Sequence, residues 1–306
     1  MFTFYAAIWR ASAGRQIVLI LLSLAIAGLA AVPLGYQREI INALTDRSAT
    51  RDDLIFLCAG MMAAIMLSLG LKWLMGFRSN ELGEDIIRLI RKAILRAFIS
   101  EGAKASRTGE ATTIITAEAE ELGKFSGSAF SEPVVQIGTL FSVIGFIAST
   151  QPRLGVIAFL MILPQIVVVL YTQSQVNRMI TERVHVLRRA SSQVASGASQ
   201  RLQQKIEAEF DTIYETRRRL FHWKLSTKFF LSAVNGVGMV SVLLIGGTMV
   251  LRGTTDVGTV VAATIGLGRL QAPTAFLIAF YRQVSANRVK YELLFDAFPD
   301  ARQDRG

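Results

Sequence analysis

The chain has 306 residues, of which 52% are apolar, 18% are charged and 24 are glycine. A soluble domain carries about 25% charged residues and fewer apolar ones, so this composition excludes a single soluble domain and a disordered chain. The chain has one cysteine and two histidines, which excludes an internal disulfide and an iron–sulfur centre and disfavours a zinc site. The net charge of +10 keeps a nucleic-acid partner under consideration.

Six apolar runs approach the ~20 residues that a helix needs to cross ~30 Å of hydrocarbon. In chain order they cover residues 16–36, 54–77, 133–150, 154–171, 229–251 and 257–281. The first run is longer than the apolar part of a secretory signal, and five more runs follow it. Residues 1–15 have an amphipathic pattern and are expected to lie in the cytoplasmic membrane interface. The sequence therefore predicts an all-α membrane protein with six transmembrane helices.

The connections between the runs alternate between short and long. Residues 37–53, 151–153 and 252–256 form a modest loop and two tight turns, whereas 78–132 and 172–228 are two arms of nearly equal length. Neither arm contains proline, and Ile87, Ile90, Ile94 and Phe98 recur at helical spacing. Each arm is predicted to be a stiff helical hairpin that continues the membrane helices. Surface coiled coils without a partner are the alternative.

The distribution of lysine and arginine predicts the orientation. Five of the 33 lie on the short-loop side and two within the runs, which leaves 26 on the side of the arms and termini. Because cytoplasmic loops carry the excess of these residues, the arms and both termini are predicted to be cytoplasmic, in a plasma membrane such as the bacterial inner membrane. Topology and an anionic inner leaflet account for the charge, so no nucleic-acid partner is expected.

Several short motifs resemble those of the ABC transporter transmembrane domain of the exporter type. Residues 251–262 (LRGTTDVGTVVA) resemble the family's G-x-hydrophobic-x-x-G-x-hydrophobic-x-A turn into its last helix, and Pro273 stands where that helix usually has proline. Residues 291–295 (YELLF) resemble the helix end before the linker to the ATPase. Gly109-Glu110, followed by Glu118, resembles the stretch at the first coupling helix.

This resemblance implies a dimer with a second copy or a homologous subunit, alternating access, and helical tips that dock onto an ABC ATPase. The tips correspond to residues 103–113 and 191–202. The residues expected to contact the ATPase are Ser106, Arg107, Thr108, Gly109, Glu110, Val194 and Gly197.

The chain itself carries no nucleotide-binding motif. Its one Gly-Lys pair, Gly123-Lys124, is followed by phenylalanine, so no phosphate-binding loop occurs, and there is no LSGGQ-like signature. We therefore expect no catalytic, cofactor-binding or metal-binding residue here, with ATP and magnesium bound by a partner. The ATPase is expected on a separate subunit or on a longer product, unless the fold has lost it.

Polar residues inside the apolar runs are the candidates for a translocation pathway. Arg269 lies near mid-membrane, where a cation is costly, and is predicted to line the pathway together with Gln271 and Asn235. A structural partner for Arg269, or free carbonyls near Pro273, is the alternative, and Asn235 can instead bond across helices. Lys72 and Arg282 are interpreted as snorkelling cations, and Glu132 as a residue at a helix start.

Two other functions compete with an ATP-driven transporter. A proton-driven peptide or solute transporter on the same scaffold would need a titratable carboxylate inside the membrane. The six runs contain none, and the candidate is Glu132 at the edge of one of them. A membrane scaffold or receptor would use the arms to recruit a cytoplasmic protein without moving a solute.

Overall fold

The computed structural model describes residues 2–47, 49–100, 118–195 and 200–297. The helices are α1 (Phe2–Leu29), α2 (Val32–Thr45), α3 (Arg51–Ser100), α5 (Ala119–Ser128), α6 (Ser131–Thr150), α7 (Pro152–Ala195), α8 (Gln200–Leu251) and α9 (Val257–Ala297). Within these ranges no residue forms a strand, and six helical stretches are long and apolar enough to cross a membrane. The predicted all-α membrane fold with six transmembrane helices is confirmed.

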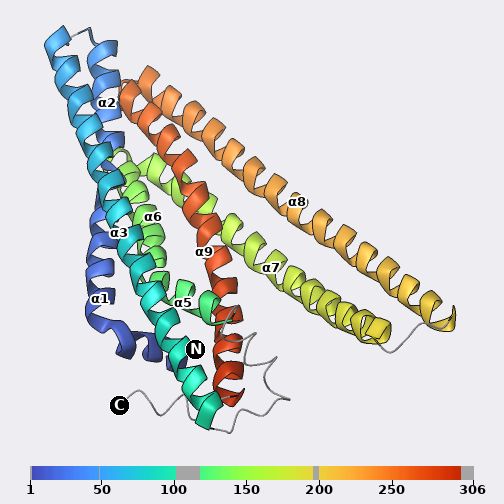
Figure 1. Ribbon diagram of the computed structural model, residues 1–306. Coiled ribbons are helices and arrows are strands. Elements are labelled where there is room, and N and C mark those ends of the chain that lie inside the picture. The colour runs from blue at the N-terminus through green and yellow to red at the C-terminus, as the bar shows by residue number, and fades with distance from the viewer. Residues whose placement is uncertain (1, 48, 101–117, 196–199, 298–306) are drawn as a thin grey trace.

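One helical hairpin departs from an otherwise compact bundle (Figure 1). Helices α1, α3, α6 and α9 run side by side, and α2 packs against α3 and α9. Helices α7 and α8 pack along each other, approach α9 at the end where α8 turns into α9, and diverge from the bundle toward the other end. We call these the converging end and the diverging end. The N-terminus lies at the diverging end.

Buried apolar side chains hold the bundle together in clusters at different levels. Near the converging end, α2, α6, α7, α8 and α9 share one cluster that includes Leu34, Ile147, Leu154, Val242 and Leu267. A second cluster joins α1, α3 and α6 through Leu19, Ile26, Met75, Leu82 and Val135. The diverging hairpin contributes to the first of these two clusters and is absent from the second.

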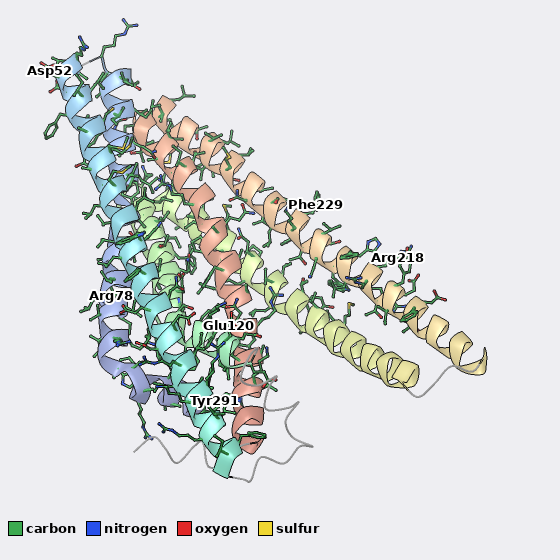
Figure 2. All side chains as sticks on the ribbon, in the orientation of Figure 1. Asp52, Arg78, Glu120, Arg218, Phe229 and Tyr291 are labelled. Carbon is green, nitrogen blue, oxygen red and sulfur yellow. The ribbon has the colours of Figure 1, made fainter. Side chains whose placement is uncertain are left out.

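Three helices are far longer than a membrane is thick. Helices α3, α7 and α8 have 50, 44 and 52 residues, which corresponds to about 75, 66 and 78 Å at 1.5 Å per residue. A hydrocarbon layer of ~30 Å accounts for less than half of each helix. The remainder extends the membrane helices toward the diverging end without a break in the helix. Figure 2 shows Asp52 and Tyr291 at opposite ends of the bundle.

The N-terminal residues form a helical segment that packs on the bundle, and its position in the membrane interface stays a prediction. Helix α1 bends at Ser12, where φ is −150°, and the preceding segment turns beneath the bundle. Phe4 and Ile8 are buried against α3, α5 and α9, and the Phe4 ring lies 5.8 Å from that of Phe125. The apolar side of this segment therefore packs on protein, because α5 offers it an aromatic surface.

The structure has two breaks between helices that the sequence pattern does not predict. One lies in the first apolar run and the other in the first arm. The first run, 16–36, contains a break at Ala30 and Ala31, after which α2 continues to Thr45 through most of the expected loop. Pro33 is in the first turn of α2, where its fixed φ favours a helix start. The returning half of the first arm is likewise divided, because α5 and α6 are separated at Ala129 and Phe130.

The predicted orientation can be tested by cysteine labelling in a Cys58→Ala background. Arg252 lies in the turn at the converging end and Arg218 on α8 in the second arm, and both side chains are exposed. In right-side-out vesicles, a membrane-impermeant maleimide is expected to label the Arg252→Cys variant at once, and the Arg218→Cys variant only after permeabilisation. The Cys58→Ala chain is the control for background labelling. The reverse pattern would contradict the orientation.

Candidate functional site

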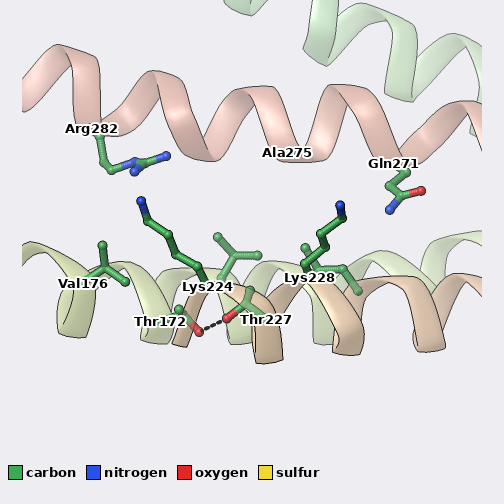
Figure 3. A pocket seen from close by; sticks show the side chains of 10 residues that line it. Thr172, Val176, Lys224, Thr227, Lys228, Gln271, Ala275 and Arg282 are labelled. Carbon is green, nitrogen blue, oxygen red and sulfur yellow. Dashed lines mark hydrogen bonds between the residues drawn. The ribbon is translucent and has the colours of Figure 1, made fainter. Parts of the chain in front are cut away.

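A basic cavity of about 440 Å³ lies between α9 and the α7–α8 hairpin (Figure 3). We call it the basic cavity and define it by the polar side chains that line it, which are Lys224, Lys228, Arg282, Gln271, Thr172 and Thr227. Lys224 and Lys228 point from α8 toward α9, where Arg282 and Gln271 point back toward them. The cavity thus joins residues that are more than 40 positions apart in the sequence.

The lysines and the arginine share this cavity without a carboxylate. In the part of the chain that the structure describes, no acidic side chain lies within ion-pair distance of Lys224, Lys228 or Arg282. The Nε atom of Arg282 is buried and has no hydrogen-bond partner. The Thr172 and Thr227 hydroxyl oxygens are 2.9 Å apart and form the floor shown in Figure 3. The site is therefore a concentration of uncompensated positive charge.

Helix geometry places the cavity toward the diverging end of the apolar parts of α8 and α9. Gln271 is 14 residues beyond the start of α9, about 21 Å from the converging end, and Arg282 is about 38 Å from it. Lys228 is 23 residues before the end of α8, or about 35 Å from the same end. The cations therefore lie at the boundary of a ~30 Å hydrocarbon layer, with Gln271 deeper inside.

The predicted pathway residues do not come together in this cavity. Gln271 lines it, whereas Arg269 donates from Nη1 to the Ala30 carbonyl oxygen at 3.3 Å. That carbonyl lies at the break between α1 and α2, so Arg269 has the structural partner that was the alternative interpretation. Asn235 is half-buried on α8, seven residues beyond Lys228. A role in the pathway stays a prediction for all three residues.

The residues predicted to contact an ATPase lie almost entirely outside the described residues. Ser106, Arg107, Thr108, Gly109, Glu110 and Gly197 belong to residues 101–117 and 196–199, which the structure does not describe. Val194 lies near the end of α7, one residue before its last. Coupling through these positions therefore stays a prediction.

Lys224 and Lys228 were not among the predicted site residues, and Arg282 was interpreted as a snorkelling cation. A sequence signal exists, because lysines four residues apart lie on one face of a helix. Their position just before the fifth apolar run made them look like part of the basic arm. Only the packing of α9 against α8 shows that these lysines and Arg282 face one another.

A second polar arrangement, which we call the outer clamp, ties α2 to α9 at the converging end. Asp256 accepts hydrogen bonds from Arg38 Nη2 at 2.9 Å, from Asn42 Nδ2 at 2.8 Å and from the Thr259 amide at 2.6 Å. The Asn42 side chain in turn accepts the Gly258 amide at 2.7 Å. A Cβ atom at Gly258 would lie 2.2 Å from the Arg38 carbonyl oxygen, so this approach requires glycine.

The turn that precedes the outer clamp contains Gly253, and it has the sharp reversal with a positive φ that a glycine at this position predicts. Gly253 has φ +67°, and it ends α8 with hydrogen bonds from its own amide to the Val250 carbonyl and from the Thr254 amide to the Met249 carbonyl, both 2.9 Å. This pair of bonds is the Schellman motif, which favours glycine at the left-handed position. The chain then reverses within a few residues and enters α9 at Val257.

Comparison with known proteins agrees with this architecture. A family model described as the ABC transporter transmembrane region matches residues 16–273. No curated protein matches the chain. The match covers every run that the sequence predicts to span the membrane, apart from the last residues of the sixth. The chain therefore belongs to the ABC transporter transmembrane region family.

Proposed function

We propose that this chain is the membrane-spanning subunit of an ATP-driven, exporter-type ABC transporter that works as a dimer by alternating access. ATP and magnesium would bind to an ATPase on another chain or on a segment beyond this sequence. The observation that carries this proposal is the continuity of α3, α7 and α8, each of which runs without a break from the membrane toward the diverging end.

Continuous helices are suited to carrying a movement from the cytoplasm into the membrane. A force applied at the tip of a helix about 75 Å long moves its membrane portion as one body, because bending the helix would strain its backbone hydrogen bonds. The converging end is held by the outer clamp and by a buried cluster. Closure of the ATPase domains would therefore swing the hairpin about that end.

Exposed apolar side chains in the second arm support a partner subunit. Phe210, Tyr214, Phe221 and Leu225 lie on one face of α8 and are each more than 50% exposed. They lie at or beyond the level of Lys224, where lipid cannot cover them, and such a surface usually marks a protein interface. A second copy, or a homologous subunit with the same hairpin, would bury this face.

Nucleotide-dependent movement between α3 and α8 tests this proposal. Spin labels on an Arg78→Cys and Arg218→Cys variant, in a Cys58→Ala background, report the separation of the two helices by electron–electron double resonance. With the partner ATPase present, ATP and vanadate are expected to shift the distance distribution beyond its own width. Figure 2 shows both labelled positions, one on the bundle and one on the hairpin.

A second spin-label pair supplies the control. Labels on an Asp52→Cys and Arg78→Cys variant both lie on α3, and their separation is expected to stay constant in every state. Unchanged distances for both pairs would contradict alternating access and favour the scaffold interpretation.

A further inference from the structure

We infer that the basic cavity binds the anionic head group, phosphate or carboxylate, of an amphipathic molecule whose apolar part extends toward the membrane centre. This inference rests on the proposed function, because it names the class of solute that the transport pathway would take. It depends on the charges of the cavity, on an unpartnered donor and on the arrangement of its apolar lining.

Several cations outside the cavity form ion pairs within the described residues. Arg15 pairs with Asp85, Lys290 with Glu121, and Arg218, on α8 itself, with Glu215 at 3.5 Å. Lys224, Lys228 and Arg282 have no such partner within the described ranges, although they surround one space. Cations at close range repel one another, and an anion between them removes that repulsion. The cavity therefore favours a negatively charged ligand.

The buried Nε atom of Arg282 is a second indication of a ligand. A buried donor without an acceptor has lost its hydrogen bonds to water without replacing them, so folded proteins rarely retain one. The guanidinium group points into the space in front of Lys224 (Figure 3). A phosphate or carboxylate oxygen there would accept from Arg282 and from the lysine ammonium groups, which are the side chains best suited to these anions.

The apolar lining indicates that the ligand is more than a small ion. Val169, Leu231 and Ala275 line the cavity beside its cations, and on α8 Leu231 is three residues nearer the converging end than Lys228. A volume of about 440 Å³ exceeds what a phosphate group needs and falls in the range of small-molecule sites. A head group at the cations therefore leaves room for a chain that contacts Val169, Leu231 and Ala275.

Binding of dodecyl phosphate to the full chain in phosphatidylcholine nanodiscs tests this inference by titration calorimetry. Wild-type protein is expected to bind it saturably, and the Lys224→Gln/Lys228→Gln/Arg282→Gln variant at least tenfold more weakly. The matched control, Arg78→Gln/Arg217→Gln/Arg219→Gln, removes the same charge outside the cavity and is expected to bind like wild type. Equal affinity of the two triple variants, or no binding by wild type, would overturn the inference.

A conservative variant separates charge from geometry. Arg282→Lys keeps the positive charge but removes the Nε donor, so dodecyl phosphate is expected to bind several-fold more weakly while still binding. This variant also guards against a folding defect in the triple variant. Wild-type affinity in Arg282→Lys would show that the buried donor does not contact the ligand and would overturn its part in the site.

Two further ligands test the head group and the tail. Inorganic phosphate has the head group alone, and dodecylphosphocholine adds a compensating positive charge; both are expected to bind at least tenfold more weakly than dodecyl phosphate. Equal binding of inorganic phosphate would exclude a role for the apolar lining. Equal binding of dodecylphosphocholine would show that net charge is not recognised. Either result would overturn the inference of an amphipathic anion.

The source of the amphipathic anion follows from the lipid composition of the nanodisc. Competition by added phosphatidylglycerol would identify a membrane lipid as the ligand, whereas an unchanged dodecyl phosphate affinity would identify a soluble amphipath. These titrations need neither ATP nor the ATPase. Anion binding without nucleotide-dependent movement would defeat the transport proposal alone, and movement without anion binding would defeat this inference alone.

Discussion

Replacing Gly127 with leucine is expected to lower the free energy of unfolding by about 3 kcal/mol, the upper part of the range for overpacking a tight contact. Gly123 and Gly127, four residues apart on α5, rest against α3 at Gly83. A Cβ atom at Gly127 would lie 2.3 Å from the Ser79 carbonyl oxygen, and one at Gly123 would lie 2.8 Å from the Gly83 carbonyl oxygen. Because these neighbours are backbone atoms, no rotamer change can make room, and α5 must move off α3.

Gly145→Leu is the matched control for this substitution. Gly145 is exposed on α6, and a Cβ atom there meets nothing within 4 Å. Leucine is also the better helix former, so this variant is expected to be as stable as wild type or slightly more stable. Thermal unfolding of both variants in the same detergent gives the comparison. Equal unfolding temperatures would contradict the close α3–α5 contact.

The consequences of moving α5 extend to the N-terminus. Helix α5 supplies Leu122 and Phe125 to the cluster in which Phe4 and Ile8 are buried. The Gln16 side chain also donates from Nε2 to the Ser126 carbonyl oxygen at 3.0 Å, which ties α1 to α5. Hydrogen exchange in residues 2–15 is therefore expected to accelerate together with that of α5 in the Gly127→Leu variant.

The membrane helices could be predicted from the sequence. An apolar run of sufficient length forms a helix that crosses the bilayer with all its backbone hydrogen bonds made within the run itself. The glycine at position 253 predicts the sharp turn before α9 for a similarly local reason, since only the backbone at that residue needs a positive φ. The break at Ala30 also has a local signal in Pro33, but an uninterrupted apolar run obscures it. Features specified within a few residues are thus accessible from sequence.

The basic cavity could not be predicted in the same way. Lys224 and Lys228 on α8 gain their significance from Arg282, which is more than 50 residues away on α9. Which face of α8 meets α9 depends on the packing of the whole hairpin, and no periodic pattern in one helix determines it. The same limit explains Arg269, whose partner at Ala30 lies 239 residues away in the sequence.

Replacing Asp256 with alanine is expected to lower the free energy of unfolding by about 3 kcal/mol, because charged hydrogen bonds contribute about 1.5–3 kcal/mol and a helix N-cap about 1 kcal/mol. Asp256 provides both, since it binds Arg38 from α2 and caps α9 through the Thr259 amide. Asp52→Ala is the matched control, because Asp52 is exposed at the same end of the bundle. The Asp52→Ala substitution is expected to lower the free energy of unfolding by less than about 1 kcal/mol.

The contribution of Asp256 to the free energy of unfolding is expected to depend on pH, because it depends on the protonation state of the carboxyl group. Burial alone would raise the pKa of Asp256, but the hydrogen bonds from Arg38, Thr259 and Asn42 outweigh it and hold this pKa well below its ordinary value of 3.8. A carboxyl group with a lowered pKa in the folded state stabilises the protein above its unfolded pKa, and this contribution is lost as the pH falls. The stability difference between wild type and Asp256→Asn, measured by thermal unfolding, is therefore expected to be constant above about pH 5 and to shrink below about pH 4. A difference that grows on acidification would contradict the outer clamp.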